Sequence, residues 1–273
     1  MWWYVKLYHA PGVEGAATDQ LLLECIKPLT VDCLAENRID HFFFLRYFDE
    51  GGHHLRLRLH LSQYDGVSRV EAHLRDLLGA QDFPIHLLHG TYEPEVNKYG
   101  GPAGLAVAER HFSASSQLAI DCVGRSVNRG AARILSAACT FERLLDLSAI
   151  AGARRATLLT FYRDYWDLVY TQLTGESRLV PSFGRVLVNW WQKSKDGDRK
   201  ARAVEAGLVG PIFAAWERSA ADSVDQMIAL KEKGRLTTQL EAIVCNLAHT
   251  FHNRLGLTVR DEVIVAGLML SEP

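Results

Sequence analysis

The sequence predicts an α+β protein in which a sheet-forming part, residues 1–102, packs against a mostly helical part, residues 103–273. Two observations lead to this class. Before residue 94, segments with apolar residues at every second position alternate with segments in which apolar residues recur every three or four positions. From Gly104 onward, only the helical spacing remains. We expect the two parts to form a single domain.

The first two expected elements are a strand and a helix. The run Trp2–Tyr8 alternates and is rich in aromatic residues, which is typical of a strand. The segment Gln20–Asn37 carries an apolar stripe at helical spacing, and Thr18 or Asp19 can cap it. Because proline lacks an N–H group, Pro28 is expected to kink this helix.

A β-hairpin is predicted for His41–Leu61, with the turn at Asp49-Glu50-Gly51-Gly52. Side chains alternate between the two faces of a strand. In the second strand of the hairpin, leucines therefore occupy one face, and basic or partly basic residues occupy the other. The residues of this second face are His54, Arg56, Arg58 and His60.

A helix at Ser68–Leu78 and a strand at Phe83–Glu93 follow the hairpin. The resulting order, β-α-β-β-α-β, is that of a ferredoxin-like sheet with two helices on one face. Burying Arg56 and Arg58 under those helices would be costly, so we expect both on the other face of the sheet. Another part of the chain must then cover that face.

Five further helices are expected from the apolar spacing: Leu105–Val123, Ala131–Ile150, Ala156–Leu173, Ala203–Leu230 and Thr238–Leu255. The charged segment Gln192–Arg202 is predicted to be a solvated linker. Two aromatic groups are assigned to packing between helices. They are Trp190-Trp191, and Phe161 with Tyr162, Tyr165 and Trp166.

Composition excludes several functional classes. The formal net charge is −2, so the whole-protein charge does not favour nucleic-acid binding, and any anion site must be local. The sequence contains no secretory signal, no run of about 18 apolar residues, and no metal-binding spacing among its five cysteines. We therefore expect a cytoplasmic protein with reduced thiols, no metal and no membrane partner.

The first candidate site is the pair Arg56 and Arg58. Two guanidinium groups on one strand face suit a carboxylate or phosphate, because each offers a planar pair of donors and remains charged. The alternative is that they lie on the solvated outer face of a sheet.

The second candidate is the segment Thr91–Pro102, in which Glu95 and Lys98 place an acid and a base at the exit of a strand. Gly100-Gly101 would allow the main chain to approach a ligand closely. An ordinary loop is the alternative.

The third candidate is the helix that carries His249 and Asn253, which lie four residues apart on one face. Asn253 could orient the imidazole of His249 for proton transfer, and His252 and Arg254 would point elsewhere. A structural histidine is the alternative. No carboxylate stands at ligand spacing, so a zinc site is not expected.

Taken together, four segments resemble the glutamate-elimination domain of class I lanthipeptide dehydratases, which also occurs as stand-alone proteins in thiopeptide pathways. The resemblance extends along nearly the whole chain. The segments are WWYVKLY, FFFLRYFDEGGHHLRLRL, TYEPEVNKYGGPAGLAVAERHFSASS and HTFHNRLG.

The resemblance implies a precursor peptide as substrate, whose Ser or Thr side chains a separate glutamyl-tRNA-dependent partner protein has glutamylated. Elimination of glutamate then yields dehydroalanine or dehydrobutyrine, without a cofactor or direct contact with nucleic acid. The motifs assign catalysis to Arg58, His249 and Arg56. Glu95 and Lys98 are implied to contact the substrate, and we add Arg46 and Asn253 to these. The family usually has arginine where this chain has Lys98, which keeps the charge but loses the bidentate geometry.

Two alternatives remain open from the sequence. A related enzyme on the same fold is a thiopeptide pyridine synthase, which joins two dehydroalanines in a formal [4+2] cycloaddition and expels the leader peptide. Retention of Arg56, Arg58, Glu95 and His249 favours elimination over this reaction. The other alternative is a non-catalytic scaffold that binds a leader peptide at an open sheet edge. The sequence is compatible with a homodimer.

Overall fold

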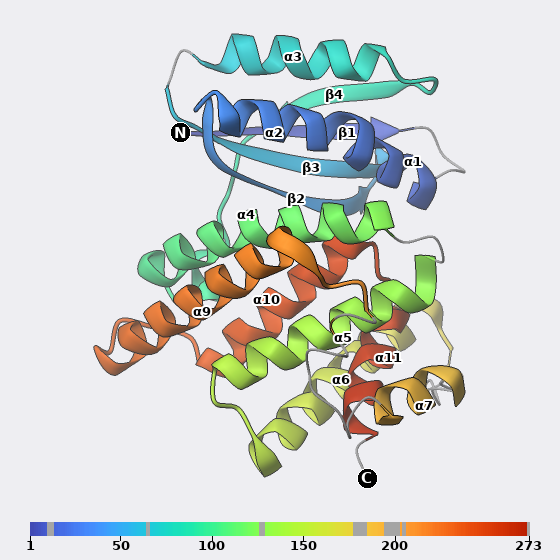
Figure 1. Ribbon diagram of the computed structural model, residues 1–273, viewed down its shortest axis with the longest axis vertical. Helices are drawn as coiled ribbons and strands as arrows, with labels where there is room; N and C mark the ends of the chain where they lie inside the picture. The colour runs from blue at the N-terminus through green and yellow to red at the C-terminus, as the bar shows by residue number, and fades with distance from the viewer. Residues whose placement is uncertain are drawn as a thin grey trace.

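The computed structural model describes residues 1–9, 14–63, 66–125, 129–176, 185–193, 203 and 206–271. A four-stranded sheet and a large helical part form the protein (Figure 1). The predicted α+β class is therefore confirmed. Among the described helices, none has both the length and the apolar character that crossing a membrane requires.

The sheet occupies the amino-terminal part, and every neighbouring pair of its strands is antiparallel. The strand order is β2-β3-β1-β4. The strands are β1 (Trp2–His9), β2 (Ile39–Asp49), β3 (Gly52–Leu61) and β4 (Ile85–Gly90). One face is covered by α1 (Glu14–Leu21), the π-helical η1 (Leu22–Ile26), α2 (Lys27–Ala35) and α3 (Val67–Gly79) (Figure 1).

The first helical segment begins at Glu14, six residues before the predicted start at Gln20, and contains one wide turn where a kink was expected. In that turn the N–H of Lys27 bonds to the carbonyl of Leu22, a spacing of five residues. Pro28 follows directly and has no N–H to donate, so a widened turn accommodates it without breaking the helix.

The remaining elements are the 3-10 helix η3 (Val96–Tyr99), α4 (Pro102–Arg125), α5 (Arg129–Leu147), α6 (Gly152–Thr174), α7 (Arg185–Lys193), α9 (Gly210–Glu232), α10 (Leu240–Leu255) and α11 (Val259–Leu270). The sequence pattern missed α7 and α11. It also placed the start of α9 at Ala203, whereas the helix begins at Gly210, directly before Pro211. Most of the predicted linker Gln192–Arg202 lies outside the described residues.

The hairpin has the predicted alternation. On β3, Leu55, Leu57 and Leu59 are fully buried on the side of α1 to α3, and Arg56 and Arg58 lie on the opposite face. That opposite face meets the helical part of the chain (Figure 1). The sequence therefore identified correctly which face carries the arginines.

Helices α4 and α10 lie along the outer edge of β2. An edge strand normally leaves every second main-chain group without a partner. Here side chains of the two helices bond these groups, at distances of 2.9 to 3.3 Å. Ser113 bonds to Phe42, Arg254 to Phe44 and Asn253 to Arg46. The sheet and the helical part are thus joined by hydrogen bonds along one strand.

Candidate functional site

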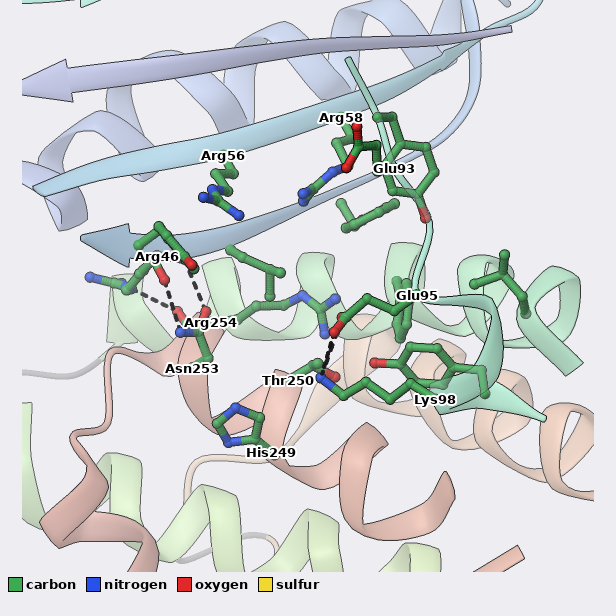
Figure 2. A pocket seen from close by; sticks show the side chains of 17 residues that line it. Arg46, Arg56, Arg58, Glu93, Glu95, Lys98, His249, Thr250, Asn253 and Arg254 are labelled. Carbon is green, nitrogen blue, oxygen red and sulfur yellow. Dashed lines mark hydrogen bonds and ion pairs between the residues drawn. The ribbon is translucent and has the colours of Figure 1, made fainter. Parts of the chain in front are cut away.

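A cavity of about 340 Å³ lies between the arginine-bearing face of the sheet and helix α10 (Figure 2). All of the predicted site residues line it, although they come from β2, β3, the loop around η3 and α10. These residues are Arg46, Arg56, Arg58, Glu95, Lys98, His249 and Asn253. The structure therefore brings together residues separated by up to about two hundred positions in the sequence.

Arg58 is buried, with only 7% of its surface exposed. Its guanidinium carbon lies 4.6 Å from the ring centre of Tyr4, 5.0 Å from that of Phe43 and 5.1 Å from that of Tyr92. Burial lowers the pKa of Arg58 from its usual value. Its Nε and Nη1 atoms have no hydrogen-bond partner, so the group is a buried cation with unused donors at the cavity wall.

Arg56 also lines the cavity and is partly exposed. Its guanidinium carbon is 3.2 Å from the ring centre of Tyr47, and its Nε donates to His54 Nε2 at 3.4 Å. The stacking fixes the orientation of the guanidinium plane. Arg56 and Arg58 thus point into one cavity from positions two residues apart on β3 (Figure 2).

His249 enters the cavity from α10, and residues outside α10 fix its ring. Its Nδ1 lies 2.8 Å from Oε1 of Glu262 on α11, and its ring stacks on Trp166 of α6 at 4.4 Å and 26°. Asn253 was expected to orient this imidazole, and that interpretation is wrong, because the partner of His249 is Glu262.

Glu262 is buried and accepts hydrogen bonds from three side chains. Besides His249, these are His252 Nδ1 and the hydroxyl of Tyr162, each at 2.5 Å from Oε2. Burial alone would raise the pKa of Glu262, but His252 and His249 hold it at about 2. An ionised carboxylate can only accept, so His249 donates from Nδ1. Its Nε2 is then the atom available to take a proton.

Asn253 and Arg46 line the cavity, but their polar groups are used within the protein. The side chain of Asn253 accepts from the main-chain N–H of Arg46 and donates to its carbonyl, each at 2.9 Å. The guanidinium of Arg46 bonds to Asp19 at 2.8 Å and to the carbonyl of Arg254 at 3.0 Å. These contacts position β2 against the end of α10.

Lys98 and Glu95 form an ion pair at the cavity rim, with 3.3 Å between Nζ and each carboxylate oxygen. Gly100 and Gly101 follow with φ of +83° and +97°. Side chains of Leu236 and Ile243 fill the space that a Cβ at Gly100 would need, and neither glycine lines the cavity. The predicted close approach of a ligand to these glycines is therefore wrong, since the neighbour is the protein's own chain.

Sequence reasoning missed Arg254 and Glu262. Arg254 was expected to point away, but it is fully buried, lines the cavity and keeps Nη2 without a partner. Burial lowers the pKa of Arg254 to about 9. The sequence signal for Glu262 was the capping box of Thr258 and Asp261, followed by a helix that is apolar on all sides. An acid within such a helix is buried, and a buried acid needs partners.

The cavity therefore combines buried cations with an oriented imidazole. Guanidinium groups with unused donors can bind a carboxylate or stabilise developing negative charge. An imidazole held by a carboxylate can remove a proton. Among the described residues, potential metal ligands gather elsewhere, at Asp40, His41 and His60, with ligand atoms within 4.8 Å of one another. None of these three lines the cavity.

The sequence matches a known protein family, and the fold is similar to that of a solved structure. Residues 2–272 match the family described as lantibiotic biosynthesis dehydratase C-term. The fold is similar to that of the tRNA-dependent lantibiotic dehydratase MibB from Microbispora sp. 107891, with a TM-score of 0.70 and 20% identity over 99% of this chain. The alignment spans 27% of the MibB chain.

TsrL aligns with a TM-score of 0.39 and 18% identity over 100% of this chain and 99% of its own. Among curated proteins, none matches the sequence. The match to the family covers nearly all of the chain, and the chain therefore belongs to the lantibiotic biosynthesis dehydratase C-term family.

Proposed function

We propose that the protein is a lyase that eliminates glutamate from glutamylated Ser or Thr residues of a ribosomally made precursor peptide. One observation carries this proposal: a buried guanidinium with unused donors, Arg58, and a carboxylate-held imidazole, His249, line the same cavity. Family membership supports a role in the biosynthesis of lanthipeptides or thiopeptides.

In the proposed reaction, Nε2 of His249 removes the Cα proton of the esterified residue. The electron pair left on Cα forms the Cα=Cβ double bond, and the bond between Cβ and the ester oxygen breaks. The departing glutamate leaves as a carboxylate, and dehydroalanine or dehydrobutyrine remains in the peptide. The proton stays on His249, whose imidazolium is stabilised by Glu262.

Arg56 and Arg58 stabilise the two negative charges of this reaction in the proposal. Charge develops on the peptide carbonyl next to Cα as the proton leaves, and then on the leaving carboxylate. Lys98, paired with Glu95 at the rim, lies where it can meet the amino acid that departs. Arg254 contributes positive potential at the cavity wall, since its guanidinium is buried and forms no ion pair with a carboxylate of the described residues.

The proposal extends to partners and setting. A separate glutamyl-tRNA-dependent protein would supply the glutamylated peptide, so this chain would need no direct contact with nucleic acid and no cofactor. We place the reaction in the cytoplasm and treat residues 1–273 as one domain. We also assign the sheet to the ferredoxin-like type, on the basis of its strand order β2-β3-β1-β4.

The test is direct conversion of a purified glutamylated precursor peptide, followed by mass spectrometry. The wild-type protein should release free glutamate and leave the dehydrated peptide, whereas Arg58→Ala and His249→Ala should leave the glutamylated peptide unchanged. Arg75→Ala, an exposed arginine on α3, is the matched control and should retain full conversion. Dehydration by both site variants at the wild-type rate would overturn the proposal.

The same assay separates the alternatives. A peptide that already contains two dehydroalanines is incubated with the protein, and loss of the leader fragment would identify the cycloaddition reaction instead. Binding of the peptide without any change in mass would identify a scaffold. The outer edge of β2 is not available for strand addition, because side chains of α4 and α10 occupy it.

A further inference from the structure

A second and larger cavity, of about 730 Å³, adjoins the candidate site. It shares Lys98 and His249 with the first cavity, so the two meet at these side chains. It lies between α6 and the first half of α10, whereas the first cavity lies against the second half of α10. Its apolar lining includes Leu158, Phe161, Tyr165, Trp166, Ala242 and Cys245, which we call the α6 groove.

The α6 groove exposes aromatic side chains to solvent. Phe161 is 68% exposed and Tyr165 is 50% exposed, although they lie one helical turn apart on the same face. Leu159, on the opposite side of α6, is buried, and Tyr162 lines the groove but is itself buried. From the sequence, the whole aromatic group is assigned to packing between helices. That assignment is wrong for Phe161 and Tyr165, and a helix with apolar residues on two faces indicates a binding surface.

Charge at the far end of the groove is neutralised within the protein. Arg154 of α6 donates to the carboxylate of Glu241 on α10, and both residues line the groove. The groove therefore offers no unpaired ion at that end, while the cations lie beyond His249 in the first cavity. An occupant with an uncharged apolar part in the groove and an anionic part in the first cavity matches this distribution.

The separation of the two cavities fits a short stretch of peptide. From Ala242 to Thr250, α10 advances about 12 Å at roughly 1.5 Å per residue. An extended chain rises about 3.3 Å per residue, so three or four residues cover this distance. One peptide can therefore place the reacting residue beside His249 and a nearby side chain in the α6 groove.

We propose that the α6 groove binds a large apolar or aromatic side chain of the peptide substrate, three or four residues from the position that reacts. This inference rests on the proposed function, because it identifies what the substrate must carry next to its reacting residue. Trp166 lines the groove and also stacks on His249, so the occupant would contact the ring that fixes the base. Sequences with an apolar residue at that distance would be selected over sequences without one.

The test uses model peptides with one Ser flanked by glycines, in which Phe is introduced in turn at each of four positions on either side. The dissociation constant is measured by fluorescence anisotropy with the unmodified Ser form, which cannot react. Turnover is measured with the glutamylated form. Phe at the favoured position should lower the dissociation constant about tenfold, as expected for burial of one aromatic side chain.

Phe161→Ser and Tyr165→Ser should reduce this preference for Phe to less than about twofold, as expected when the buried apolar contact is removed. Both residues are exposed, so the fold should be retained. Leu173→Ser, at another exposed apolar residue of α6 outside the groove, is the matched control and should keep the preference.

The outcomes separate the two proposals. Equal affinity for the Phe and Gly peptides, unchanged by the α6 variants, would overturn the groove inference even if glutamate is eliminated. Preferential binding of Phe peptides without elimination would support the groove and overturn the lyase. If sedimentation shows a dimer that Phe161→Ser converts to a monomer, with peptide affinity unchanged, the groove is an interface between two copies of this chain.

Discussion

The Nδ1 atom of His249 lies 2.8 Å from Oε1 of Glu262, which joins the candidate base on α10 to a buried carboxylate on α11. Glu262 is a positioning residue in this arrangement, since it does not line the cavity. Glu262→Gln should lower kcat for elimination about 100-fold and change KM by less than about twofold, because an amide does not hold the required tautomer as a carboxylate does. Glu262→Asp should restore part of the rate.

His252→Gln is the matched control for this experiment. His252 contacts the other oxygen of Glu262 but does not line the cavity. If His252→Gln and Glu262→Gln lowered both kcat and the free energy of unfolding by equal amounts, the role of Glu262 would be structural only.

The shape of the Arg58 guanidinium is expected to matter as well as its charge. Arg58→Lys keeps a cation but loses the planar pair of donors and the stacking on Tyr4, Phe43 and Tyr92. We expect kcat/KM for the glutamylated peptide to fall at least about tenfold, the loss of one charge-assisted contact. Steady-state kinetics with Arg75→Lys as control would measure this, and an unchanged kcat/KM would argue against a bidentate contact.

Substitution of Lys98 tests how much a cation at the cavity rim contributes, and whether a planar pair of donors would serve better there. Lys98→Arg should retain or increase activity, because the positive charge remains and a second donor is gained. Lys98→Met should raise KM about tenfold by removing a charged contact. Lys231→Met, at an exposed lysine of α9, is the control. If all of these variants had the same kcat and KM as the wild type, Lys98 would not contact the substrate.

Asn253 is expected to act on stability more than on chemistry. Asn253→Ala leaves the main-chain N–H and carbonyl of Arg46 without their partners. The free energy of unfolding should fall by about 1–2 kcal/mol, since water at the cavity can replace part of what is lost. Urea denaturation would measure this. Asn246→Ala, which removes one bond to the carbonyl of Lys98, should have a smaller effect.

The buried His111 predicts acid sensitivity. Its burial on α4, together with Arg254, lowers its pKa from 6.5 to about 3. As pH falls below 6.5 the unfolded chain takes up a proton that folded His111 does not, so the folded state loses stability. Between pH 7 and pH 5 this amounts to about 2 kcal/mol. His111→Leu should remove this part of the pH dependence in urea denaturation, and the exposed His86→Leu should leave it unchanged.

The sequence predicted the hairpin and its arginine face because the side chains of a strand can point to only two faces. Leucines at 55, 57 and 59 had to face a core, which placed Arg56 and Arg58 opposite. The link between these arginines and His249 came only from the resemblance, which assigned catalysis to all three. Spacing alone cannot relate a strand to a helix almost two hundred residues away.

The errors have a common physical origin. Helical periodicity shows that a face is apolar but not what covers it, so Phe161 and Tyr165 could not be distinguished from core residues. In the same way, the partner of His249 was sought within its own helix, at Asn253. The actual partner is supplied by α11, which turns back after Gly256, and only the capping box at Thr258 signals where that helix begins.

The hydrogen bonds between the edge of β2 and the helices α4 and α10 also determine whether the chain can be cut into separate fragments. A fragment ending near residue 102 would lose Ser113, Asn253 and Arg254, and the outward main-chain groups of β2 would then face water. Such an edge is a template for pairing with other molecules, so the isolated sheet should self-associate. Dividing the chain near residue 102 to express the two parts separately is therefore not expected to succeed. Arg56 and Arg58 would also lose the side of the cavity that faces them.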